Sequence, residues 1–199
     1  KGSLAALMAY NLMQKVVAEI DVGIDFHTGG ANRYNAPQTR YNPKDERAKE
    51  IAMAFNAPLS LASNLIDKSL RKEAFKMGKT IVVYEGGESM RFDEEAIQQG
   101  ILGAKKVLNH FGMIDFKSKK VESYNCLSSS WVRAKSSGLI QLQVNSGQVV
   151  ERNQLLALIT DPFGNFETKI KAPRGGVIIG HNNAPLVNKG DALFHLGIE

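Results

Sequence analysis

The chain has 199 residues, 43% of them apolar, and carries a formal net charge of +5. This length suits one large or two small globular domains with a sizeable core, and the absence of any apolar run of about 18 residues excludes a membrane-spanning helix. The single cysteine, Cys126, excludes an internal disulfide and favours a reducing compartment, so we expect a cytoplasmic protein.

The positive charge is spread along the sequence. Its densest stretch, residues 117–120, has no interleaved aromatic side chains, so we interpret it as a solvated linker and expect no nucleic-acid partner. An anionic small-molecule substrate would explain the excess positive charge as well as a nucleic-acid partner would.

Residues 4–20 are expected to form a helix, because Ser3 is a suitable N-cap and apolar residues follow at spacings of three and four. A strand-forming run, residues 22–26, then brings His27 to its C-terminal end before a turn at Gly29-Gly30. Ligands of open α/β sheets bind beyond the carboxyl ends of the strands, so His27 is a candidate ligand. A lone imidazole also fits an ordinary loop or core histidine.

Residues 31–44 contain two prolines, three asparagines and two arginines without a clean period, which predicts a long loop beside His27. Arg33 and Arg40 in this loop are guanidinium groups suited to recognising a carboxylate. The alternative is a surface loop whose arginines are merely solvated.

A helix over 45–56, a short strand over 59–62 and a short helix over 69–77 that carries Arg71 are expected next. Residues 80–84 then predict a buried strand that ends at Glu85, followed by Gly86-Gly87. The first pattern thus recurs, with a titratable residue between a strand and two glycines.

His27 and Glu85 are therefore expected to meet at one edge of one parallel sheet, as a metal ligand and a general base must. The alternative for Glu85 is a salt-bridged loop residue. A helix over 93–111 closes this region, and His110 in its last turn is explained by the helix dipole.

Residues 115–130 turn polar, and we place a domain boundary there, with domains at 1–118 and 119–199. Short β-prone runs separated by turns follow, which favours a small barrel or sandwich. The pattern resembles the barrel-sandwich fold of biotinyl and lipoyl carrier domains. Such carriers need a lysine at a hairpin tip where this chain has Asp161-Pro162-Phe163-Gly164-Asn165, so we expect a structural or lid role instead.

The order of motifs, Ile24-Asp25-Phe26-His27-Thr28-Gly29-Gly30, then Val82-Val83-Tyr84-Glu85-Gly86-Gly87, then a helix and a small β domain, resembles the succinylglutamate desuccinylase and aspartoacylase family. These are zinc-dependent amidohydrolases related to the zinc carboxypeptidases. The resemblance implies an α/β fold class: a partial zinc-carboxypeptidase-like α/β/α sheet domain, followed by a small all-β barrel-sandwich-like domain.

In that family a His-x-x-Glu pair and a second histidine hold Zn2+, and a glutamate activates the bound water and passes its proton to the leaving amine. By resemblance, His27 is the second histidine and Glu85 the catalytic glutamate. Arg71, 14 residues before Glu85, is the best match to the arginine that holds the substrate carboxylate, with Arg33 and Arg40 as alternatives.

The 199 residues contain no His-x-x-Glu, and they lack the family's Asn-Arg-x-Phe-Pro-Gly segment with its substrate-binding Asn-Arg. Because the chain starts at Lys1 without methionine, inside a helix start, we expect both to lie upstream and this stretch alone to be inactive. The predicted function is hydrolysis of the amide bond of an N-acyl amino acid. The alternatives are a scaffold that kept the fold without the metal, and a β domain that packs over a neighbour's active site in a homo-oligomer.

Overall fold

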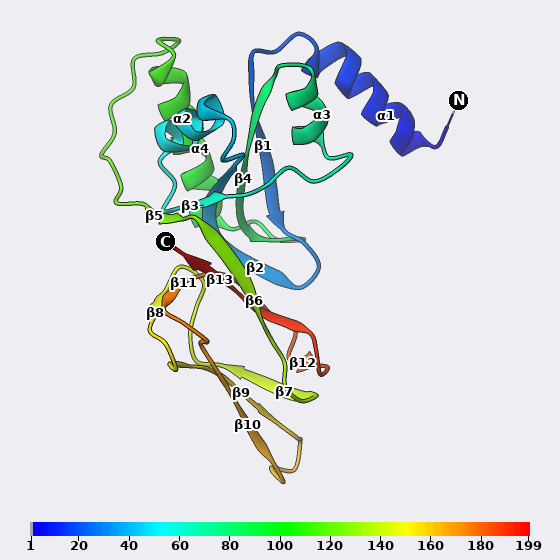
Figure 1. Ribbon diagram of the computed structural model, residues 1–199, viewed down its shortest axis with the longest axis vertical. Helices are drawn as coiled ribbons and strands as arrows, with labels where there is room; N and C mark the ends of the chain where they lie inside the picture. Colours follow the sequence, from blue (N-terminus) through cyan, green and yellow to red (C-terminus); the bar gives the residue numbers. More distant parts are fainter. Residues whose placement is uncertain (1) are drawn as a thin grey trace.

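The computed structural model describes residues 2–199, so Lys1, the first residue of the predicted 1–118 domain, lies outside the described residues. The elements in chain order are α1 (Leu4–Leu12), η1 (Met13–Val17), β1 (Val22–Gly29), β2 (Arg33–Tyr41), α2 (Glu46–Phe55), β3 (Leu59–Ala62), α3 (Leu70–Lys76), β4 (Thr80–Glu88), α4 (Glu94–His110), β5 (Tyr124–Cys126), β6 (Ser128–Arg133), β7 (Gly138–Leu142), β8 (Val149–Val150), β9 (Leu155–Thr160), β10 (Glu167–Lys171), β11 (Gly176–Asn182), β12 (Leu186–Val187) and β13 (Ala192–Ile198). The fold is mixed α/β, with the helices gathered around β1, β3 and β4 at one end and only strands and loops at the other (Figure 1).

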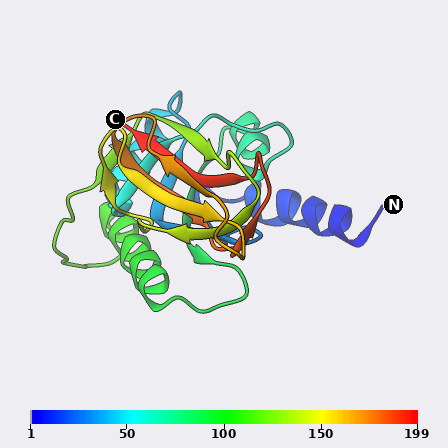
Figure 2. The same cartoon turned by 90° about the horizontal axis from the view of Figure 1, so that it is seen from below.

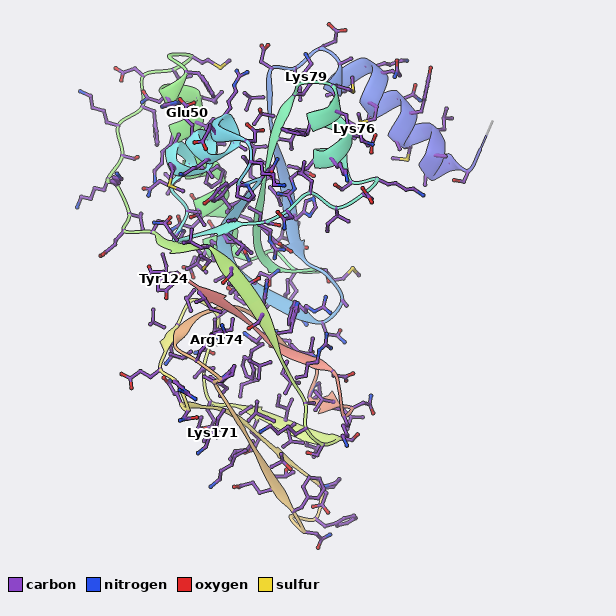
Figure 3. The ribbon with its side chains drawn as sticks, in the orientation of Figure 1. Glu50, Lys76, Lys79, Tyr124, Lys171 and Arg174 are labelled. Atoms are coloured by element: carbon purple, nitrogen blue, oxygen red, sulfur yellow. The ribbon has the colours of Figure 1, made fainter. Side chains whose placement is uncertain are left out.

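A nine-stranded sheet runs through the molecule in the order β1-β4-β2-β11-β13-β6, with β3 paired to β2 and β5, and β8 paired to β11. A second sheet has the order β10-β9-β7-β12. The pairing of β11 with β2 joins strands from the two ends of the sequence into one sheet. The boundary between residues 118 and 119 stays a prediction, and Tyr124 lies where the helical end meets the β-rich end (Figure 3).

Helices cover both faces of the α/β end of the sheet. Neighbouring β4 residues point to opposite faces, and Val82 packs with α2 and α4 whereas Ile81 packs with η1 and α3. The expected helix over 4–20 is present, but its α-helical part, α1, gives way to the π-helical η1. Figure 2 shows α1 projecting to one side, and none of its residues is buried. Within residues 2–199 no helix is long and apolar enough to cross a membrane.

The prediction of a loop over residues 31–44 is wrong, because most of it forms the central strand β2. β2 pairs with β4, β3 and β11, and these partners bury even its polar residues Gln38 and Thr39 completely. Pro37 fits because the register with β4 shifts between Asn35 and Gln38, where no ladder hydrogen bond from residue 37 is required.

The prediction that the second strand stops at its glycines is also wrong. β4 runs through Gly86 and Gly87 to Glu88, and Gly87 adopts a φ of 72° that favours glycine. In β1, a Cβ at Gly29 would lie 2.1 Å from the carbonyl oxygen of Arg33. The glycines therefore allow close backbone approach within the strands.

Candidate active site

β1 and β4 are parallel neighbours, and His27 pairs with Glu85 in their register. The expected meeting of these two residues on neighbouring parallel strands is therefore confirmed, whereas the expected parallel sheet is mixed, because β4 also pairs antiparallel with β2. His27 is half exposed, with 49% of its side chain accessible, and its Nε2 lies 3.0 Å from Asp25 Oδ2. Asp25 is two residues earlier on the same strand, so both side chains leave the same face.

Glu85 is held by two side chains of β2. Asn35 Nδ2 donates a hydrogen bond of 2.9 Å to Glu85 Oε1, and Arg40 Nη2 lies 2.7 Å from Oε2. Only 13% of the Glu85 side chain is accessible. These donors orient the carboxylate, and because a carboxylate offers about four lone-pair sites, it retains acceptors for water or substrate.

Arg71 is a buried cation that pairs with no carboxylate among the described residues. It lies in the first turn of α3, is 8% exposed, and donates through Nη2 to Ser63 Oγ at 3.2 Å. Its Nη1 is buried and has no hydrogen-bond partner within residues 2–199. Burial lowers the pKa of Arg71, and the positive charge of Arg40 lowers it further, against the opposing effect of Asp25 and Glu85. Such a group is suited to an anionic ligand.

Two cavities adjoin His27. The larger, 650 Å³, lies against α4 and has mainly apolar walls. The smaller, 380 Å³, collects the charged groups, and we take it as the candidate active site; its lining residues are Asp25, His27, Arg40, Ile66, Ser69, Leu70, Arg71, Val83 and Glu85. Four of the five predicted site residues thus line one cavity.

Arg33 is the exception, because its guanidinium carbon lies 5.1 Å from the centre of the Trp131 ring and the residue does not line the smaller cavity. The sequence analysis missed Asp25 and Asn35. Asp25 was detectable, since a strand places residues i and i+2 on one face. Asn35 could not be identified, because residues 31–44 were predicted to form a loop and no facing strand could be assigned to it.

A catalytic zinc site normally has three protein ligands. Among residues 2–199, no group of three or more His, Cys, Asp or Glu side chains is arranged to hold a metal ion. The described residues therefore offer one histidine, His27, with the Asp25 carboxylate beside it, as metal-binding histidines commonly have.

Comparison with known proteins identifies relatives. The profile of the succinylglutamate desuccinylase/aspartoacylase catalytic domain matches residues 3–111. The N-alpha-acetyl-L-2,4-diaminobutyric acid deacetylase of Halomonas elongata is 25% identical over 210 residues, which cover 96% of this chain and 60% of the relative.

Solved structures share the fold over the whole chain. The product-bound ectoine utilization protein EutE (DoeB) from Ruegeria pomeroyi superimposes with a TM-score of 0.87 at 23% identity, covering 100% of this chain and 64% of that one. A succinylglutamate desuccinylase from Silicibacter sp. TM1040 gives 0.84 at 23% identity, again with 100% and 64% coverage. The chain thus spans less than two thirds of the length of these relatives.

Proposed function

Because the chain belongs to the succinylglutamate desuccinylase/aspartoacylase family, we propose that it is part of a zinc-dependent deacylase that hydrolyses the amide bond of an N-acyl amino acid. The α/β end would have the zinc-carboxypeptidase-like arrangement, with the β-rich end as a barrel-sandwich-like domain. The reducing compartment favoured by the lone buried Cys126 supports a cytoplasmic location.

The observation that carries this proposal is the pairing of His27 with Glu85 beside a cavity that holds an unpaired, buried Arg71. Glu85 would accept the proton of the attacking water and then give it to the leaving amine. Asn35 and Arg40 would act as positioning residues, because each donates to one Glu85 oxygen. General acid and base catalysis of this kind contributes about 100-fold or more.

His27 would supply one zinc ligand, with Asp25 fixing the imidazole through Nε2. We propose that a His-x-x-Glu pair outside these 199 residues supplies the others, which the partial coverage of the relatives supports. Bound zinc would lower the pKa of a coordinated water toward about 7. Residues 1–199 alone are therefore expected to be inactive.

The substrate carboxylate would bind Arg71, whose buried guanidinium has an unpartnered nitrogen at the cavity. Arg40 is engaged with Glu85, and Arg33 is directed to Trp131, so we prefer Arg71 among the three arginines. The name of the Halomonas elongata relative supports an N-acyl amino acid as the class of substrate.

The test is Glu85→Gln in the full-length protein, assayed for release of free amine from N-acetyl amino acids. We expect the rate to fall at least about 100-fold while the zinc content is unchanged. Glu50→Gln is the matched control, since Glu50 lies on the helical end and is half exposed (Figure 3). Full activity of Glu85→Gln would refute the assigned role. A parent protein with neither hydrolysis nor zinc would favour the scaffold.

A further inference from the structure

Asn35, the side chain of β2 that donates to Glu85, lies between two glycines of neighbouring strands. In the sheet register it pairs with Gly180 of β11 on one side and with Gly87 of β4 on the other. Asn35 is buried, with 4% of the residue exposed. Because β11 belongs to the β-rich end, that end adjoins a direct partner of the proposed catalytic glutamate.

The chemistry of the Glu85 contact fixes the orientation of the Asn35 amide. An ionised carboxylate only accepts hydrogen bonds, so the amide nitrogen has to face Glu85, to which it donates at 2.9 Å. The amide oxygen, Oδ1, must then lie on the other side, against β11. Exchanging the two amide atoms would place one oxygen against another, and the hydrogen bond to Glu85 would be lost.

Gly180 leaves the space in which this oxygen lies. A Cβ at position 180 would lie 2.1 Å from Asn35 Oδ1 and 3.2 Å from Asn35 Cγ. It would also lie 2.9 Å from the backbone carbonyl oxygen of Tyr34. Non-bonded heavy atoms pack best at about 3.5 Å or more, so a side chain at position 180 would displace the Asn35 amide.

The backbone of Gly180 does not require glycine. Its φ lies outside the positive range that favours this residue, unlike the φ of Gly87. Glycine inside a strand weakens the strand, and it often marks a place where another group approaches closely. At Gly180 the approaching side-chain group is the Asn35 amide.

The Asn35 amide matters because Glu85 has one donor on each oxygen. Asn35 donates to Oε1, and Arg40 Nη2 lies 2.7 Å from Oε2. With Asn35 displaced, the carboxylate keeps Arg40 alone and can turn about that contact. A hydrogen bond to a charged group is worth about tenfold or more in an equilibrium, and a misplaced catalytic group loses rate.

We propose that Gly180 is a positioning residue of the active site. Because it has no side chain, it seats the Asn35 amide oxygen against β11, and the amide nitrogen then orients Glu85. This inference rests on the proposed function. It gives the β-rich end a part in catalysis that needs no contact with the substrate.

The test is a double-mutant cycle in the full-length protein, with Gly180→Ala, Asn35→Ala and the double variant. Gly180→Ala should lower kcat for amine release from N-acetyl amino acids about tenfold. KM should change less than about twofold, because the lost interaction acts on the transition state and not on substrate binding. Asn35→Ala should lower kcat equally, and the double variant should lower it no further, because the displaced amide is already absent.

Unfolding in urea gives a readout that does not depend on hydrolysis. Gly180→Ala should lower the urea midpoint of the parent, but it should lower the midpoint of Asn35→Ala much less, because the clashing amide is gone. Gly175→Ala is the matched control, since Gly175 is exposed just before β11 and a Cβ there would lie no closer than 3.5 Å to another atom. Its kcat and midpoint should be those of the parent.

The double variant also decides the case in which Gly180→Ala alone does not fold. Folding restored by Asn35→Ala would support the proposal. A double variant that also fails to fold would place the clash at the Tyr34 carbonyl and overturn the proposal.

A parental kcat in Gly180→Ala, or additive effects of the two substitutions on kcat, would overturn the positioning role and leave the proposed function in place. A parent protein that releases no amine would refute the proposed function. The urea midpoints would then still test how Gly180 seats Asn35: coupled effects would support it, and additive effects would overturn it.

Discussion

Protonation of His195 should destabilise the protein as the pH falls. His195 is 7% exposed and stacked on Trp131. Burial, together with the positive charges of Arg40 and Arg33, lowers the pKa of His195 from 6.5 to about 4. Between these values the unfolded chain binds the proton and the folded chain does not. The stabilising contribution is therefore complete above pH 6.5 and is lost as the pH falls toward about 4.

The loss is large enough to measure. Each unit of pKa shift corresponds to about 1.4 kcal/mol, so the free energy of unfolding should fall by about 3 kcal/mol once the pH reaches 4. Urea unfolding followed by far-ultraviolet circular dichroism at pH 7.5 and 4.5 should capture about 2 kcal/mol or more of it. His195→Gln removes the titration, so this variant should lose correspondingly less stability than the parent over the same interval.

Titratable groups that both proteins retain contribute equally to the change in unfolding free energy, so their contribution cancels when the two proteins are compared. These include His181, whose pKa is also lowered by burial, and the carboxylates. His110→Gln is the control, because His110 lies at the exposed end of α4 and 39% of its side chain is accessible. An equal loss of stability in the parent and in His195→Gln would refute the reasoning.

Two further substitutions test packing and charge. Gly103→Ala would place a Cβ 2.0 Å from the Phe55 ring, so urea unfolding should show that the free energy of unfolding falls by about 2 kcal/mol. The control, Gln99→Ala on the same helix, should change it by no more than about 0.5 kcal/mol. Equal stabilities of the two variants would contradict this packing. Arg71→Met should raise the KM of the full-length enzyme more than about tenfold without lowering its urea midpoint, because a buried charge without a carboxylate partner adds little stability. A lower midpoint with an unchanged KM would make Arg71 a structural residue.

Sequence patterns identified the elements whose causes are local. Asp45, Ser69 and Asp93 each accept a hydrogen bond from a backbone amide three residues later, so these helix starts depend on a few neighbouring residues. The runs before His27 and Glu85 likewise consist of residues that favour strands. The parallel pairing of those two residues followed from the repeated motif.

Only the tertiary structure determines that residues 33–41 form a strand. Nothing in their order of polar residues and proline predicts a strand, because their burial comes from β3, β4 and β11. That strand then supplies Asn35 and Arg40 to Glu85, which is 50 and 45 residues away in sequence.

A cavity of 440 Å³ on the other side of Arg40 from Glu85's cavity depends on the same kind of pairing between segments distant in sequence. It brings Arg40 together with Trp131 and His195, which come from strands that lie far apart along the chain. The sequence by itself thus determined the helix starts, the strands before His27 and Glu85, and the identity of those two residues, since these depend on short-range propensities and capping. Only the tertiary structure decided which side chains surround Glu85, because sheet register is set by contacts between segments that local patterns do not relate.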